Sequence, residues 1–170
     1  MPNVPVVDQD GRSYRFAEDL VKDHVVLVNV MYTRCDGKCL GAADGLKAAQ
    51  DALGERVGRD VRILSISIDP ENDTPDVLKA YAEAHDAGPG WYFLTGAPPD
   101  IEQLRKRLGF TDPDPVVDAD RSQHAAIVLL GNEPRARWTM AVSATDLDGV
   151  LAAFHRVTDD PRDWKPWFPR

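Results

Sequence analysis

The stretch YTRCDGKC at residues 32–39 follows a run of mainly apolar residues at 25–30 and precedes a helical pattern that begins near Leu40. It contains the only two cysteines of the chain, Cys35 and Cys39. Because they are four positions apart, one helical turn would place both sulfurs on the same face, whereas an extended strand would hold them too far apart to share a bond or an ion. The stretch therefore predicts a strand that ends in a loop and turns into a helix, with both thiols at the turn.

The charges around the two cysteines favour ionised thiols. The positive end of a helix dipole stabilises thiolate over thiol, and the neighbouring Arg34 and Lys38 act in the same direction. Two thiolates side by side suit either disulfide exchange or the binding of a soft metal ion. The pair is therefore a candidate redox-active or metal-binding site.

Other interpretations of the two cysteines fit less well. Free cysteines are often inert buried residues, but the Arg, Asp, Gly and Lys neighbours are typical of an exposed loop. The spacing has three intervening residues, whereas thioredoxin-type redox pairs have two. A zinc site would need four protein ligands, and the chain has no second cysteine pair.

Length, composition and charge limit the possible classes of protein. A chain of 170 residues with 43% hydrophobic content fits a single domain, 1–170, with one sizeable core. The net charge of -8 argues against a sequence-independent nucleic-acid binder, which needs a basic face. No apolar run approaches the ~20 residues that cross a bilayer, and residues 1–10 lack signal-peptide features. We expect a soluble chain, or the soluble part of a longer protein.

Strand and helix patterns alternate along the chain. Asp10-Gly11 between two short β-like runs predicts an N-terminal hairpin, and the run at 25–30 predicts a central strand covered on both faces. Further strands are expected at 61–68, 91–94, 125–130 and 135–140, with helices at 40–57, 75–85, 99–108 and 146–157. This order predicts an α/β sandwich in which helices flank a mixed central sheet. The cysteines would then lie at the carboxyl end of a central strand, where such sheets usually place their chemistry.

The connecting segments also carry predictions. The acidic loop at 69–75 has a structural explanation, because Thr74 is placed as an N-cap and Pro75 at the first helical position. Residues 111–120 read as an acidic loop and 131–134 as a hairpin turn. The tail at 159–170 is expected to be irregular.

Four histidines are present, and His124 is the candidate ligand. His24, His85 and His155 occupy positions at which structural or solvated roles are expected. His124 lies where the acidic loop enters the strand 125–130, a junction at which side chains can face a site.

Several separated motifs together resemble the Sco/SenC family. They are the stretch 32–39, the run SIDPENDTP at 67–75, the segment FLTG at 93–96 and His124 before an apolar strand, in the family's order between about Val6 and Leu130. The resemblance implies a thioredoxin-like fold and a copper site of two thiolates, Cys35 and Cys39, and the His124 imidazole. It also implies work in assembling the dinuclear copper centre of cytochrome oxidase. The implied location is extracytoplasmic, with a membrane anchor in the full-length protein.

The chain departs from the family pattern at three positions. Leu40 stands where the family usually has proline, Gln123 where it often has aspartate, and Ala125 where it often has serine. Because neighbours of a metal-binding histidine fix which ring nitrogen faces the metal, we expect the copper affinity to differ from the family norm.

Our hypothesis is a copper metallochaperone of the Sco type. Soft thiolates select Cu(I), and an added imidazole lets the same site hold Cu(II). The ion would pass by ligand exchange to the cytochrome oxidase copper-centre subunit or to another copper acceptor. We expect a monomer.

Two other functions remain open. A thiol-disulfide oxidoreductase would use Cys35 and Cys39 as a redox-active pair to reduce the cysteines of a copper acceptor, such as the oxidase copper centre, or of another extracytoplasmic protein. This reaction does not need His124, so the sequence leaves open whether the chain is an enzyme. A binding module without chemistry would instead dock a partner through the acidic loop 111–120 or the aromatic tail at 164–168.

Overall fold

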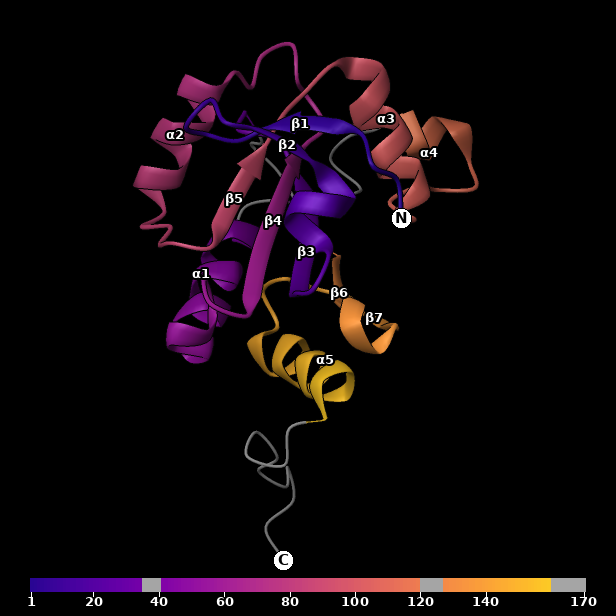
Figure 1. Ribbon diagram of the computed structural model, residues 1–170. Coiled ribbons are helices and arrows are strands. Elements are labelled where there is room, and N and C mark those ends of the chain that lie inside the picture. Colours follow the sequence, from indigo (N-terminus) through magenta and orange to yellow (C-terminus); the bar gives the residue numbers. More distant parts are fainter. Residues whose placement is uncertain (35–40, 120–126, 160–170) are drawn as a thin grey trace, which may run out of the picture.

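A five-stranded mixed sheet forms the centre of the computed structural model, which describes residues 1–34, 41–119 and 127–159 (Figure 1). The strand order is β5–β4–β3–β6–β7, with β3, β4 and β5 parallel and β6 and β7 antiparallel to their neighbours. The strands are β3 (Val25–Met31), β4 (Val61–Ser67), β5 (Trp91–Leu94), β6 (Val128–Asn132) and β7 (Arg137–Ala141). Every residue of β3 is buried, which explains why its sequence is apolar at consecutive positions.

The predicted N-terminal hairpin is present. It pairs β1 (Pro5–Val7) with β2 (Ser13–Arg15), and Asp8 closes its turn by accepting the backbone N–H groups of residues 10 and 12. The hairpin is tied to the sheet because Val7 and Thr95 exchange backbone hydrogen bonds of 2.7 and 2.9 Å just beyond β5. A single π-helical segment, η1 (Phe16–Val21), follows the hairpin.

Helices on one face and a mixture of elements on the other complete the sandwich. The first face is covered by α1 (Ala42–Leu53), α2 (Pro75–Ala84) and α5 (Leu147–Thr158). The second is covered by the hairpin, η1 and α3 (Pro98–Arg107). The mixed sheet between these two layers is the predicted α/β sandwich.

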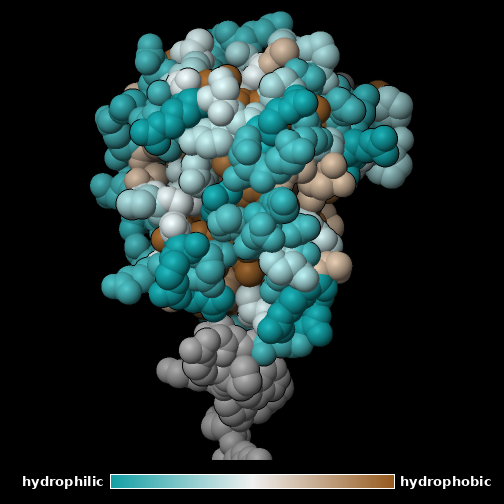
Figure 2. All heavy atoms as spheres, viewed as in Figure 1, coloured by the Kyte–Doolittle hydropathy of each residue, from teal (hydrophilic) through white to brown (hydrophobic). Residues whose placement is uncertain are grey.

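The outer surface is mainly hydrophilic on the side that Figure 2 shows, in keeping with the net charge of -8. Some apolar side chains are nevertheless exposed on or just beyond the edge strand β7, among them Trp138, Met140 and Val142. Within residues 1–34, 41–119 and 127–159, no helix combines the length and the apolar character needed to cross a membrane.

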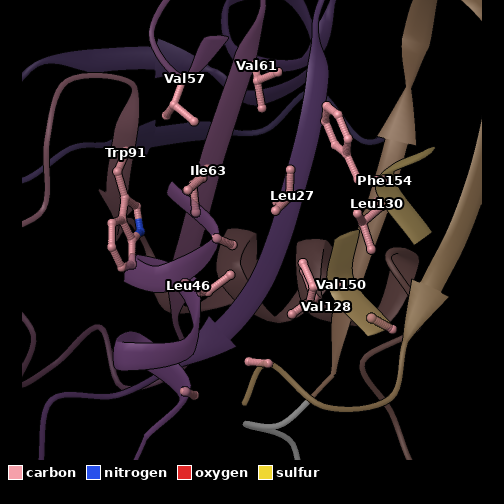
Figure 3. Packing of buried hydrophobic residues seen from close by; sticks show 14 of the residues in the cluster. Leu27, Leu46, Val57, Val61, Ile63, Trp91, Val128, Leu130, Val150 and Phe154 are labelled. Carbon is pink, nitrogen blue, oxygen red and sulfur yellow. The ribbon is translucent and has the colours of Figure 1, made fainter. Parts of the chain in front are cut away.

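Alternate residues of the strands pack into two separate hydrophobic cores, one on each face of the sheet. Leu27, Ile63 and Leu130 point to the helical face, where they meet Leu46 of α1 and Phe154 of α5 (Figure 3). Their neighbours along the strands point to the other face, against η1 and α3. Burial on both faces fixes the register of the central strands, because a shift of one residue would exchange the two sets.

Two local predictions are wrong. The 111–120 stretch is not all loop, because α4 (Pro115–Ala119) forms within it after Asp114 accepts the backbone N–H of Val116. The turn expected at 131–134 comes later, since β6 continues to Asn132 and a 3-10 turn follows at Glu133–Arg135. Gly131 pairs with Val26 and Trp138 in the ladder, and the Trp138 ring covers it, so that a Cβ there would lie 2.1 Å from a ring carbon.

The helix expected at 40–57 is shorter than predicted. Residue 40 lies outside the described part of the chain, and α1 ends at Leu53, where Gly54 adopts a positive φ of 56°. The irregular tail predicted at 159–170 also falls outside the described residues from 160 onward.

Candidate functional site

The three predicted ligands, Cys35, Cys39 and His124, lie outside the described residues, so their arrangement stays a prediction. The structure does describe where the chain leaves and returns on either side of them. Segment 35–40 follows the carboxyl end of β3, and segment 120–126 leads into β6. Because β6 runs antiparallel to β3, with Leu129 opposite Val28, its first residues lie toward that same carboxyl end.

A buried carboxylate, Asp73, anchors the chain just before the cysteines. Its side chain is fully buried and accepts hydrogen bonds from three donor groups. The Thr33 backbone N–H donates to Oδ2 at 3.1 Å, and the Thr33 hydroxyl donates to Oδ1 at 2.5 Å. The Ser67 hydroxyl donates to Oδ2 at 2.5 Å. A buried carboxylate is stable only when donors replace its lost hydration, and Asp73 is supplied by two chain segments.

The loop that carries Asp73 is itself closed by hydrogen bonds. Asp69 is 6% exposed, and its two carboxylate oxygens accept bonds of 3.1 and 3.0 Å from the Asn72 amide. Its backbone N–H donates to the Ser67 hydroxyl. The Asp69 carbonyl accepts the backbone N–H groups of Asn72 and Asp73. Thr74 stands at the N-cap position with Pro75 after it, as predicted, but among the described residues its side chain makes no capping bond. The acidic loop therefore has a structural role and also holds Asp73 toward Thr33.

A chain of buried polar groups lies beneath the start of α1. The Trp91 indole N–H donates to the Ser65 hydroxyl at 2.9 Å, and that hydroxyl donates to Asn29 Oδ1 at 2.7 Å. These groups come from three adjacent strands, so the sheet holds the Asn29 amide in one orientation. Sequence reasoning missed this chain, because it depends on the register that places residue 29 opposite residue 65.

A small cavity of about 10 Å³ adjoins this polar chain, close to the smallest volume that admits a water molecule. Residues from both sides of segment 35–40 line it. The lining residues are Asn29, Met31, Tyr32, Ala42, Ala43, Leu46, Ser65, Tyr81 and Phe93. The space is too small for an organic substrate, so within the described residues it offers no substrate pocket of its own.

Tyr81 of α2 lies between this cavity and the surface. Burial raises the pKa of the Tyr81 phenol, and the carboxylates of Asp44 and Asp73 raise that pKa further. The ring centroids of Tyr81 and His85 are 4.5 Å apart, and His85 Nδ1 lies 3.1 Å from an Asp44 oxygen. These contacts join α2 to the first turn of α1, immediately after segment 35–40.

The remaining histidines have contacts of the structural kind expected for them. His24 Nδ1 lies 2.6 Å from the Lys22 carbonyl, and His85 pairs with Asp44. His155 of α5 is packed edge-on against Phe154. Within the described parts of the chain, no group of three His, Cys, Asp or Glu side chains could hold a metal ion. The three predicted copper ligands, Cys35, Cys39 and His124, all lie outside these parts.

Comparison with known proteins gives a consistent result. The SCO1/SenC family model matches residues 5–159. The SCO1 protein homolog of Bacillus subtilis is 35% identical over 91 residues, which are 52% of this chain and 45% of that protein. The chain thus matches less than half the length of this relative.

Two solved structures share the fold. A SCO1/SenC family lipoprotein from Bacillus anthracis superposes with a TM-score of 0.71 at 23% identity, over 91% of this chain and 92% of that one. The Bradyrhizobium japonicum ScoI structure with copper bound gives a TM-score of 0.67 at 24% identity, over 89% of this chain and 98% of that one. The predicted thioredoxin-like α/β fold is confirmed.

Proposed function

Because the chain belongs to the SCO1/SenC family, we propose that it binds one copper ion through Cys35, Cys39 and His124 and transfers it to an acceptor protein. The acceptor that fits the family is the subunit that carries the dinuclear copper centre of cytochrome oxidase. The Bradyrhizobium japonicum relative of the same fold was solved with copper bound, which supports copper as the cargo.

One observation carries the proposal. The cysteine segment follows the carboxyl end of β3. The histidine segment precedes β6, and because β6 runs antiparallel to β3, the first residues of β6 lie near that same end of β3. Thr33, two residues before Cys35, is held there by the buried Asp73. Ligands on segments that start from fixed points at one edge of a sheet can meet without reorganising the core.

The chemistry of the donor set suits copper. Thiolates stabilise Cu(I), and the imidazole extends the site to Cu(II). Each thiol must lose its proton when its sulfur binds the ion, so copper affinity is expected to rise with pH until both thiols are ionised. Transfer by ligand exchange would reverse this step. Ligands of the acceptor, whose thiols lose their protons as they bind, would replace Cys35, Cys39 and His124 one at a time, and the freed thiolates of this chain would take up protons from solution.

The proposal is tested by titrating the reduced protein with copper and repeating the titration on Cys35→Ser, Cys39→Ser and His124→Ala. We expect each serine variant to lose the visible charge-transfer absorption of the Cu(II) complex, and the alanine variant to bind Cu(II) about 10- to 100-fold more weakly. Unchanged binding in all three variants contradicts the proposal. Disulfide-reductase activity that survives His124→Ala, together with negligible copper affinity, would instead assign the cysteines to thiol-disulfide exchange.

We also propose that the full-length protein works outside the cytoplasm, attached to a membrane. The Bacillus anthracis relative is a lipoprotein, which supports this location. Fractionation of cells that produce the natural full-length protein tests it, and recovery in the cytoplasmic fraction would contradict it.

A further inference from the structure

Arg105 of α3 joins two parts of the chain through its guanidinium group. Its side chain is 7% exposed. Nη1 and Nη2 donate to the two carboxylate oxygens of Asp118 at 2.7 and 2.8 Å, while Nε and Nη2 donate to the two oxygens of Glu102 at 2.9 Å each. Nη1 also donates to the Phe110 carbonyl at 2.7 Å. Both carboxylates are therefore bound in the two-pronged geometry that a planar guanidinium favours.

The two carboxylates differ in what they connect. Glu102 lies on α3 itself, three residues before Arg105, so this pair links α3 only to itself. Asp118 lies on α4, so its pair fixes α4 against α3. Asp118 also accepts the backbone N–H of Asp112 at 2.8 Å, which closes the loop between the two helices.

Val116, one of the two valines of α4, adds little apolar packing to the placement of this helix. The helix has five residues, and Val116 on it is 79% exposed. The side chain of Asp118 is only 19% exposed. The bond to Arg105 thus ties the end of α4 to another helix.

The stretch that contains His124 begins where α4 ends. His124 comes six residues after Asp118, and β6 begins four residues later at Val128, where ladder bonds to β7 and β3 fix the backbone. One flank of the histidine is therefore held by the sheet and the other by Arg105. A ligand with both flanks fixed has less conformational entropy to lose when it binds a metal ion.

Resting on the proposed copper function, we propose that Arg105 and Asp118 are positioning residues for His124: their bond preorganises the histidine for copper. Neither side chain needs to touch the metal ion. Asp118 precedes the histidine segment in sequence and is far from the cysteine segment along the chain, so we expect the bond to leave the chemistry of the two cysteines unchanged.

The two partners of Arg105 provide a matched test. Asp118→Asn removes one of the acceptor oxygens that fix α4, whereas Glu102→Gln makes the same chemical change within α3. Cu(II) affinity is measured by competition with a chelator for each variant, in the natural background and in His124→Ala, with thermal unfolding as a check of folding. Arg105→Lys keeps the positive charge but cannot bind a carboxylate in the two-pronged geometry of a guanidinium. It serves as a second variant should Asp118→Asn fail to fold.

We expect Asp118→Asn to weaken Cu(II) binding about tenfold, as loss of a group that orients a metal ligand commonly does. In the His124→Ala background the same change should alter affinity by less than about twofold, because the residue it positions is gone. Glu102→Gln should stay within about twofold in both backgrounds. The reduction potential of the cysteine pair should not move in any of these variants.

Two results overturn the inference while leaving the three-ligand proposal in place. Equal loss of affinity from Asp118→Asn with and without His124 would show a general effect on the fold, and no loss in the natural background would show no positioning role. If His124→Ala binds copper as tightly as the natural chain, the three-ligand proposal is wrong, and this inference fails with it. The His124→Ala titration alone separates that failure from the other two.

Discussion

Asp73 is the residue that connects the described structure to the proposed copper site most directly. Its carboxylate is fully buried and receives hydrogen bonds from Thr33 and Ser67, which are 40 and 6 positions away in sequence. Asparagine at this position would keep the shape, but its NH₂ group cannot accept from a hydroxyl or an N–H. One or more of these donors would then be left buried without an acceptor, which costs more than the bond itself contributes.

Asp73→Asn is therefore expected to lower the free energy of unfolding by about 2–3 kcal/mol. The measurement is urea unfolding of the reduced protein without metal, which separates stability from copper binding. Glu71→Gln is the control, since Glu71 is exposed in the same loop and should change stability by less than about 0.5 kcal/mol. Equal stability of Asp73→Asn and the natural chain would show that the three bonds are replaceable by water.

Residue types, spacing and the family resemblance lead to the prediction of Cys35, Cys39 and His124 as ligands, and this stays a prediction because the three residues lie outside the described parts of the chain. Residue types and spacing could not predict that Asp73 reaches Thr33. An aspartate in an acidic loop looks the same whether it points to solvent or into the protein, and only the packing of β3 beside β4 decides this. The family motif at 67–75 contained the residue but not its role.

At Gly45, the backbone of α1 lies close to the backbone of Ala144 and Thr145, just before α5. Gly45 lies inside α1, yet a Cβ there would come within 2.0 Å of the Ala144 carbonyl oxygen. Glycine within a helix normally costs about 1 kcal/mol relative to alanine. The close approach of the two backbones explains why a residue unfavourable for the helix occupies this position.

Two effects of opposite sign thus compete in Gly45→Ala. Helix propensity predicts a gain of about 1 kcal/mol, whereas moving a backbone segment to make room for a methyl group typically costs about 1–3 kcal/mol. The overlap is with backbone atoms that cannot rotate away, so we expect a net loss of stability, measured by urea unfolding. Ala48→Gly in the same helix calibrates the propensity effect. A stabilised Gly45→Ala variant would mean that α1 and Ala144 separate easily.

Elements with a clear periodic pattern could be predicted, whereas α4 could not. The central strands are apolar at consecutive positions, and α2 begins at a Thr-Pro signal. The sequence of α4 has five residues and an exposed valine, with aspartates and prolines around it that are typical of a loop. Asp114 stabilises the start of this helix, and Arg105 of α3 bonds to Asp118 on it. A contact from a different helix cannot be recognised in the sequence of α4 itself.

Across the whole molecule, the two apolar cores fill the two faces of the sheet, and the hydrogen bonds of Asp73 lie at the carboxyl ends of β3 and β4. The order of strands and helices was enough to predict this division, because burial on both faces of β3 leaves few ways to arrange the layers. The same layers bury ionisable groups that belong to different elements. Stability of the entire fold should therefore depend on pH through these groups, even without copper.

At alkaline pH the group to follow is Tyr81. Burial, with Asp44 and Asp73, raises its pKa in the folded protein, while in the unfolded chain it ionises near pH 10. Its contribution to stability is thus fully present below about pH 10 and is lost as the pH rises through the folded pKa, by up to about 1.4 kcal/mol for each pH unit between the two values. Urea unfolding from about pH 9 upward should show a flatter decline for Tyr81→Phe than for the natural chain. Some decline should persist in the variant, because burial and a hydrogen bond with Asp8 also raise the pKa of Tyr14. Identical declines in the two proteins would place the Tyr81 hydroxyl in contact with water.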